Sequence, residues 1–62
     1  MNIENLNIFD ISFTVDRSQT IQKFRHITSA KYLSDTAAQT RVAKALDVEN
    51  GRINVVHVYW DD

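Results

Sequence analysis

Apolar and polar residues alternate near the start of the chain. In the segment NIFDISFTV, residues 7–15, every second side chain is large and apolar: Phe9, Ile11, Phe13 and Val15. A period of two is typical of a β-strand with one buried face, and Phe, Ile and Val favour strands. The polar residues from Asp16 to Gln19 then predict a turn. We therefore expect a first strand over residues 7–15 that ends at this turn.

The segment TIQKFRHITSAK, residues 20–31, is compatible with two structures. Ile21, Phe24 and Ile27 recur every three residues, which suits a helix with Ser18 as its N-cap. The same residues favour a strand, and the short turn before them suits a hairpin. Neither face of such a strand is uniformly apolar, so a bulge or an exposed face is needed. We favour a second strand and keep the helix as the alternative.

The segment SDTAAQTRVAKALDVENG, residues 34–51, predicts an α-helix. Ser34 or Asp35 can cap it, because a short side-chain oxygen accepts a hydrogen bond from an unpaired backbone N–H of the first turn. Alanine favours helices, and Asp47–Gly51 ends this one. The apolar face is expected to hold four residues at helical spacing: Ala38, Val42, Ala45 and Leu46. Three polar residues are expected toward solvent: Gln39, Arg41 and Lys44.

The last segment, Ile53–Trp60, is largely apolar on both sides if it is extended. Strict alternation places four residues on one face: Ile53, Val55, His57 and Tyr59. It places four on the other: Asn54, Val56, Val58 and Trp60. Valine and aromatic residues favour a strand. Because a single helix covers only one face of a sheet, we expect the other face to remain open to a partner. A second helix is the alternative for this segment.

Together these elements predict an α+β fold in the order strand–strand–helix–strand (ββαβ), as a single domain over residues 1–62. It consists of a small antiparallel sheet with one helix packed on one face. A right-handed crossover through the helix sets the third strand parallel to the second. If the third strand pairs with the first, the first strand is central and the helix covers its apolar side.

This order of elements resembles that of small accessory proteins encoded by bacteriophages. The resemblance implies a protein-interaction module that binds and modulates a host or partner protein.

A shorter segment, QTRVAKALDVENGRINVV over Gln39–Val56, resembles the helix-turn-helix of Cro-type phage repressors. Ala43 matches the small residue where the two helices cross, and five residues match the buried positions of that motif: Val42, Leu46, Val48, Ile53 and Val56. The resemblance implies an alternative fold, a helix-turn-helix with an N-terminal strand, and an alternative function, a DNA-binding transcriptional regulator. It places Gln39 on a phosphate. It places four residues at the major groove: Asn50, Gly51, Asn54 and Val55.

Length and composition favour association with a protein. A chain of 62 residues buries only about 60% of the surface that its unfolded form exposes. Small domains usually compensate with disulfides, metals or partner subunits. The chain has no cysteine, which excludes disulfides and thiolate metal sites. We therefore expect it to bind another protein, itself as a homodimer, or both. The net charge of −1 disfavours nucleic acid, whose binding proteins tend to be basic.

No pattern for catalysis or cofactor binding is present in the sequence. The two histidines, His26 and His57, do not have the spacing of a zinc motif, and Gly51 alone makes no phosphate-binding loop. We expect no enzymatic activity, no metal and no cofactor. A signal peptide and an apolar run long enough for a membrane span are both missing from the sequence, so we expect a cytoplasmic protein, in the host cytoplasm if phage-encoded.

The candidate partner-binding residues come mainly from the face of the last strand that carries Val55, His57 and Tyr59, which we expect to be open; Trp60, on the other face, is added for its aromatic side chain. Tyrosine and tryptophan dominate binding hot spots because they bury a large area with few rotatable bonds. Four residues are expected at the centre of the contact: Val55, His57, Tyr59 and Trp60. Lys23 and Arg25 are expected at its rim.

Overall fold

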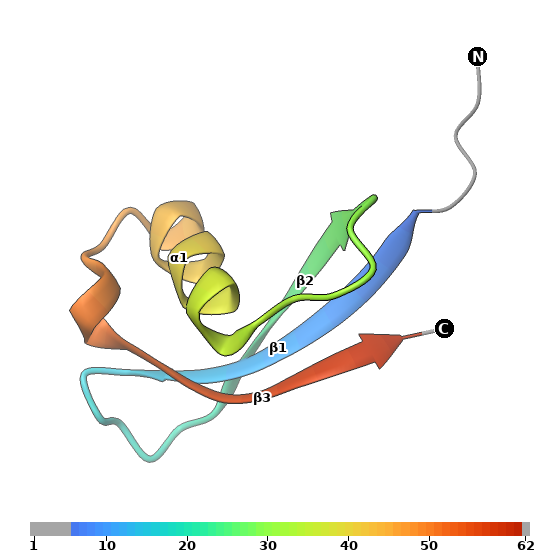
Figure 1. Ribbon diagram of the computed structural model, residues 1–62. Helices are drawn as coiled ribbons and strands as arrows, with labels where there is room; N and C mark the ends of the chain where they lie inside the picture. The colour runs from blue at the N-terminus through green and yellow to red at the C-terminus, as the bar shows by residue number, and fades with distance from the viewer. Residues whose placement is uncertain (1–5, 62) are drawn as a thin grey trace.

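A computed structural model describes residues 6–61 and contains a three-stranded sheet and one α-helix (Figure 1). The elements, in chain order, are β1 (Asn7–Val15), β2 (Gln22–Thr28), α1 (Asp35–Leu46), the short 3-10 helix η1 (Asn50–Arg52) and β3 (Ile53–Asp61). The strand order in the sheet is β2-β1-β3, and β1 is antiparallel to both neighbours. The predicted α+β class and ββαβ order are confirmed.

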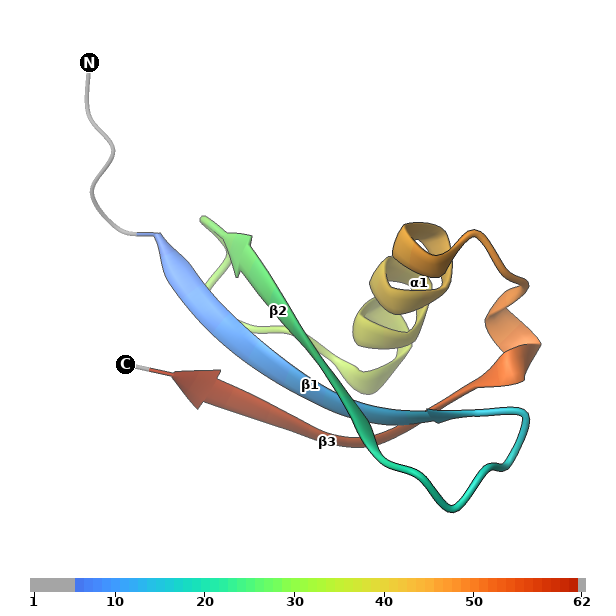
Figure 2. The ribbon, with the colours of Figure 1, turned by 180° about the vertical axis from the view of Figure 1, so that it is seen from behind.

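The helix covers one face of the sheet, and the opposite face is open. Views from the front and from behind both place α1 on a single side of the sheet (Figures 1 and 2). The central strand turns Phe9, Ile11 and Phe13 toward α1, and all three are buried. The alternation seen in the sequence therefore marks the face of β1 that the helix covers.

A tight turn joins β1 to the segment that leads into β2. Asp16 and Arg17 both have positive φ, at 53° and 61°, and the backbone N–H of Ser18 donates to the carbonyl of Val15 at 3.0 Å. This is the backbone of a type I′ turn, which matches the twist of antiparallel strands but favours Asn and Gly. Asp16 also accepts two short hydrogen bonds from Arg52, at 2.9 Å from Nε and 2.6 Å from Nη2. The predicted turn is confirmed, and the ion pair ties it to the start of β3.

Residues 22–28 form a strand, so the helical alternative for the second segment is wrong. In β2, Phe24 and His26 lie opposite Ile11 and Phe9, on the side of α1, and both are half-buried. Lys23 and Arg25 point to the open face and are exposed. The mixed pattern of this segment has a simple cause: β2 is an edge strand, and no residue of β2 is fully buried.

Local sequence signals determine both ends of α1. The hydroxyl of Ser34, rather than Asp35, caps the first turn by accepting a hydrogen bond from the N–H of Ala37 at 3.1 Å. After Leu46, Asp47 adopts a left-handed conformation with φ of 60°, and the N–H of Val48 donates to the carbonyl of Ala43 at 2.9 Å. This is a Schellman ending, which satisfies the last carbonyl groups of a helix.

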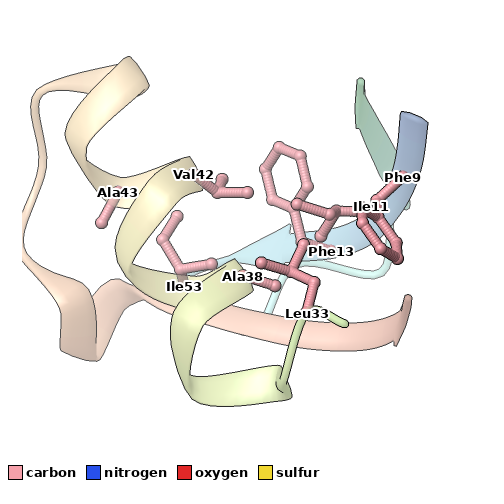
Figure 3. Packing of buried hydrophobic residues seen from close by; sticks show 8 residues of the cluster. All are labelled: Phe9, Ile11, Phe13, Leu33, Ala38, Val42, Ala43 and Ile53. Atoms are coloured by element: carbon pink, nitrogen blue, oxygen red, sulfur yellow. The ribbon is translucent and has the colours of Figure 1, made fainter. Parts of the chain in front are cut away.

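Eight buried apolar residues form the core between α1 and the sheet (Figure 3): Phe9, Ile11, Phe13, Leu33, Ala38, Val42, Ala43 and Ile53. Ala38 and Val42 were expected there, but Ala45 and Leu46 are exposed, so their assignment to the buried face was wrong. Ala43 is buried instead. The connection from α1 back to β3 packs against the side of the helix that carries Gln39 and Ala43, one turn apart. The buried face is therefore rotated relative to the one expected from spacing alone.

Residues 53–61 are extended along β1, which decides between the two interpretations of the C-terminal segment. β3 pairs with β1 from Val15↔Ile53 to Ile8↔Asp61. The helix-turn-helix alternative requires a second helix in this segment, and that fold assignment is wrong.

Candidate functional site

The strand β3 is an edge of the sheet and contains a bulge at Val56. Ser12 lies opposite His57 and Phe13 lies opposite Val55, so Val56 has no partner residue on β1. An extra residue in one strand reverses the faces of the residues on either side of it. Val55 therefore lies on the side of α1, packed against the core, whereas His57 and Tyr59 lie on the open face.

The open face has a polar centre rather than the apolar surface expected from the sequence. Six polar residues lie on it: Asp10, Ser12, Lys23, Arg25, His57 and Asp61. Arg25 reaches across the sheet, with its Nε 3.1 Å from Asp10 and its Nη2 3.4 Å from Asp61. The hydrogen bond to Asp10, and then the negative charges of Asp10 and Asp61, raise the pKa of Arg25 above its ordinary value. Both pairs are exposed, so water and salt screen them and they contribute little to stability.

The aromatic residues of β3 lie on opposite sides of the sheet. On the open face, the rings of His57 and Tyr59 are 5.2 Å apart with an angle of 55° between their planes. On the other face, Trp60 lies opposite Phe9 and is 58% exposed, so it does not close the core. Its indole Nε1 donates to the side-chain oxygen of Asn7 at 3.3 Å, and Asn7 donates to the carbonyl of Ala30 at 2.9 Å. Asn7 thus links Trp60 to the segment between β2 and α1.

A shallow groove of about 500 Å³ runs along β3 on the side of α1. Its apolar lining comes from β1, β3 and the segment between β2 and α1: Phe9, Tyr32, Leu33, Val56, Val58 and Trp60. Three further residues line it: Lys31, Asp35 and, next to the bulge, His57. Tyr32 is 77% exposed and Val56 is 49% exposed, so large apolar surfaces face water here. Clustered exposed apolar residues of this kind mark surfaces that bind other molecules.

The structure brings only some of the predicted partner-binding residues together. His57, Tyr59, Lys23 and Arg25 share the open face. Trp60 faces the groove on the opposite side, and the half-buried Val55 packs against the core on that side, so the expectation that Val55 lies beside His57 and Tyr59 was wrong. Val55 lies on the other face because of the bulge at Val56, which an assignment by strict alternation does not take into account. Val56, which the sequence did not single out for partner binding, takes the exposed position instead. The sequence around Val56 does not indicate a bulge, because Val56 is an apolar residue like its neighbours Val55 and Val58.

The residues of the DNA-binding alternative have structural roles or lie in other positions. The side-chain amide of Gln39 is half-buried and donates to the carbonyls of Asn50, at 2.6 Å, and Ile53, at 3.1 Å. Asn50 donates from its side chain to the hydroxyl of Thr40 at 3.1 Å. Gly51 belongs to η1, and Asn54 is an exposed residue of β3. Gln39 thus holds the connection between α1 and β3.

Neither a metal cluster nor a membrane-spanning helix is found over residues 6–61. No group of three or more His, Asp or Glu side chains in this range is placed to hold a metal ion. The one α-helix described, α1, is too short and too polar to cross a bilayer.

Comparison of the chain with protein-family models, with curated proteins and with solved structures gives no match.

Proposed function

We propose that this chain is a protein-interaction module whose contact surface is β3, formed by the backbone edge of that strand and the side chains beside it. The observation that carries the proposal is a nine-residue edge strand with exposed apolar side chains on both sides. The outer edge of such a strand presents unpaired backbone N–H and C=O groups, which can add a further strand from a partner.

The side chains along β3 support the same role. Tyr59 on the open face is 62% exposed, and Trp60 and Val56 line the groove on the other side. A strand added to β3 would place its alternate side chains over Tyr59 on one face and over the groove on the other. The backbone would then supply affinity and the two rows of side chains would supply specificity.

The element order supports a partner that is a protein. It resembles that of small bacteriophage accessory proteins, and this resemblance points to modulation of a host or partner protein in the cytoplasm. The balance of seven basic and eight acidic residues disfavours a nucleic-acid surface.

Photo-crosslinking tests this proposal in cells that express the chain. Replacement of Val56 by p-benzoylphenylalanine places a photoreactive group at the groove without removing a buried residue. The same replacement at Arg41, on the exposed side of α1, is the matched control. We expect a protein adduct from position 56 and none from position 41. Equal labelling at the two positions, or an adduct with nucleic acid alone, would contradict the proposal.

A further inference from the structure

We propose that the strand added to β3 is β3 of a second copy of this chain, antiparallel, with Tyr59 opposite Tyr59 of that copy. This inference rests on the proposed function, because it names the occupant of the same edge. It creates a six-stranded antiparallel sheet with a two-fold axis perpendicular to it, so that both helices lie on one face. Such an interface is isologous: each contact occurs twice.

The two edges of the sheet differ in a way that favours pairing through β3. Natural sheets protect their edges with charged residues, proline or bulges. The edge strand β2 carries Lys23 and Arg25 within seven residues. In β3, residues 53–60 include no Lys, Arg, Asp, Glu or Pro. The bulge at Val56 protects only the first part of β3 and leaves His57–Asp61 in regular register with β1.

The five regular residues of β3 are complementary to themselves when the strand is reversed. Centred on Tyr59, antiparallel pairing sets His57 opposite Asp61 of the copy, both on open faces. This pair sets an imidazole N–H donor opposite a carboxylate acceptor. It sets Val58 opposite Trp60 of the copy, on the side of α1, and it stacks the two Tyr59 rings as a cross-strand aromatic pair. Opposite charges and aromatic pairs across strands are the side-chain contacts that stabilise antiparallel sheets. No like-charged pair faces itself in this register.

The groove also fits a second copy. With Trp60 of the copy next to Val58, an indole covers the apolar row that Val56, Val58 and Tyr32 leave exposed. A specific interface buries at least about 1,000 Å² in total, or about 500 Å² from each copy. That is about a tenth of the accessible surface of 4837 Å², and the exposed side chains of Tyr32, Val56 and Trp60 lie along this edge to contribute to it.

Single-cysteine variants test the register directly, because the natural chain has no cysteine and every disulfide would be intermolecular. Side chains directly opposite one another in an antiparallel pair have Cβ atoms about 5 Å apart, close to the reach of a disulfide. We expect Tyr59→Cys to form a covalent dimer under mild oxidation at least about tenfold faster than Ile27→Cys. Ile27 is the matched control, since it lies on the same open face and is 57% exposed, but belongs to β2. Faster oxidation of Ile27→Cys, or of Val58→Cys in place of Tyr59→Cys, would overturn the pairing.

Light scattering of the full chain during size-exclusion chromatography gives an independent test. The mass should rise from 7.2 kDa toward twice that value with increasing concentration. Tyr59→Lys, which sets two positive charges opposite one another, should weaken dimerisation at least about tenfold, and Ile27→Lys should not. A mass of 7.2 kDa at millimolar concentration would overturn this inference. If position 56 still crosslinks to a different protein, the proposed function stands without the homodimer; if it crosslinks to nothing, both fall.

Discussion

The side-chain amide of Gln39 is expected to be the main polar link between α1 and the start of β3. Its two hydrogen bonds, to the carbonyls of Asn50 and Ile53, are 2.6 and 3.1 Å long. At about 1 kcal/mol net for each bond, Gln39→Ala should lower the free energy of unfolding by about 2 kcal/mol. A chain of this length is stable by only about 3–9 kcal/mol, at roughly 0.05–0.15 kcal/mol per residue. The better helix propensity of alanine offsets only a few tenths of a kcal/mol.

Urea unfolding followed by far-ultraviolet circular dichroism measures this loss. With a slope of about 1 kcal/mol per molar urea, the midpoint of Gln39→Ala should fall by about 2 M. Arg41→Ala is the control, because Arg41 is an exposed residue of the same helix, and its effect should stay within about 0.5 kcal/mol. Equal midpoints for the two variants would refute the reasoning and return Gln39 to the solvent-facing role that the sequence suggested.

Three further predictions concern stability and use the same unfolding measurement. Ile11→Ala, at a fully buried position of β1, should lower the free energy of unfolding by about 3 kcal/mol, and a loss below about 1 kcal/mol would contradict the core described above. Arg17→Gly should raise it by about 0.5–1 kcal/mol, because glycine adopts the positive φ of this turn without steric cost; a decrease would show that the turn differs. The hydrogen bond from Arg52 is the main cause that lowers the pKa of Asp16 below its ordinary value of 3.8. The stabilisation by this ion pair is therefore present above pH 3.8 and is lost as the pH falls through the folded-state pKa. The urea midpoint of the natural chain minus that of Asp16→Asn, a residue that suits the same turn, should therefore be larger at pH 7 than below pH 3.8; a difference independent of pH would exclude a contribution from the ion pair.

Signals that depend only on neighbouring residues predicted most of the secondary structure. The alternation of β1 reports its buried face, because successive side chains of a strand point to opposite sides. Ser34 caps α1 and Asp47 ends it, since each acts on backbone groups within one turn of itself. The valines of the last segment favour the strand that forms. In β2, by contrast, the pattern was ambiguous because an edge strand buries neither face fully.

Contacts between distant segments decided the features that the sequence left open. Ala43 is buried rather than Ala45 because the connection to β3 packs against the side of α1 that carries Gln39. Which side of a helix is covered depends on the path of the chain after the helix, and helical spacing does not encode that path.

For the candidate interaction surface, too, the sequence predicted the general character and the tertiary structure decided the residues. The sequence by itself determined that the C-terminal segment carries more apolar and aromatic surface than one helix can cover, since that follows from composition and length. Only the tertiary structure decided which residues face outward. The bulge forms where β3 meets Ser12 and Phe13 of β1, and it turns Val55 toward the core and leaves Val56 exposed. Side chains of a strand alternate between the two faces of the sheet, so one extra residue moves every residue that follows it to the opposite face. Only the pairing of β3 with β1 determines which residue is the extra one.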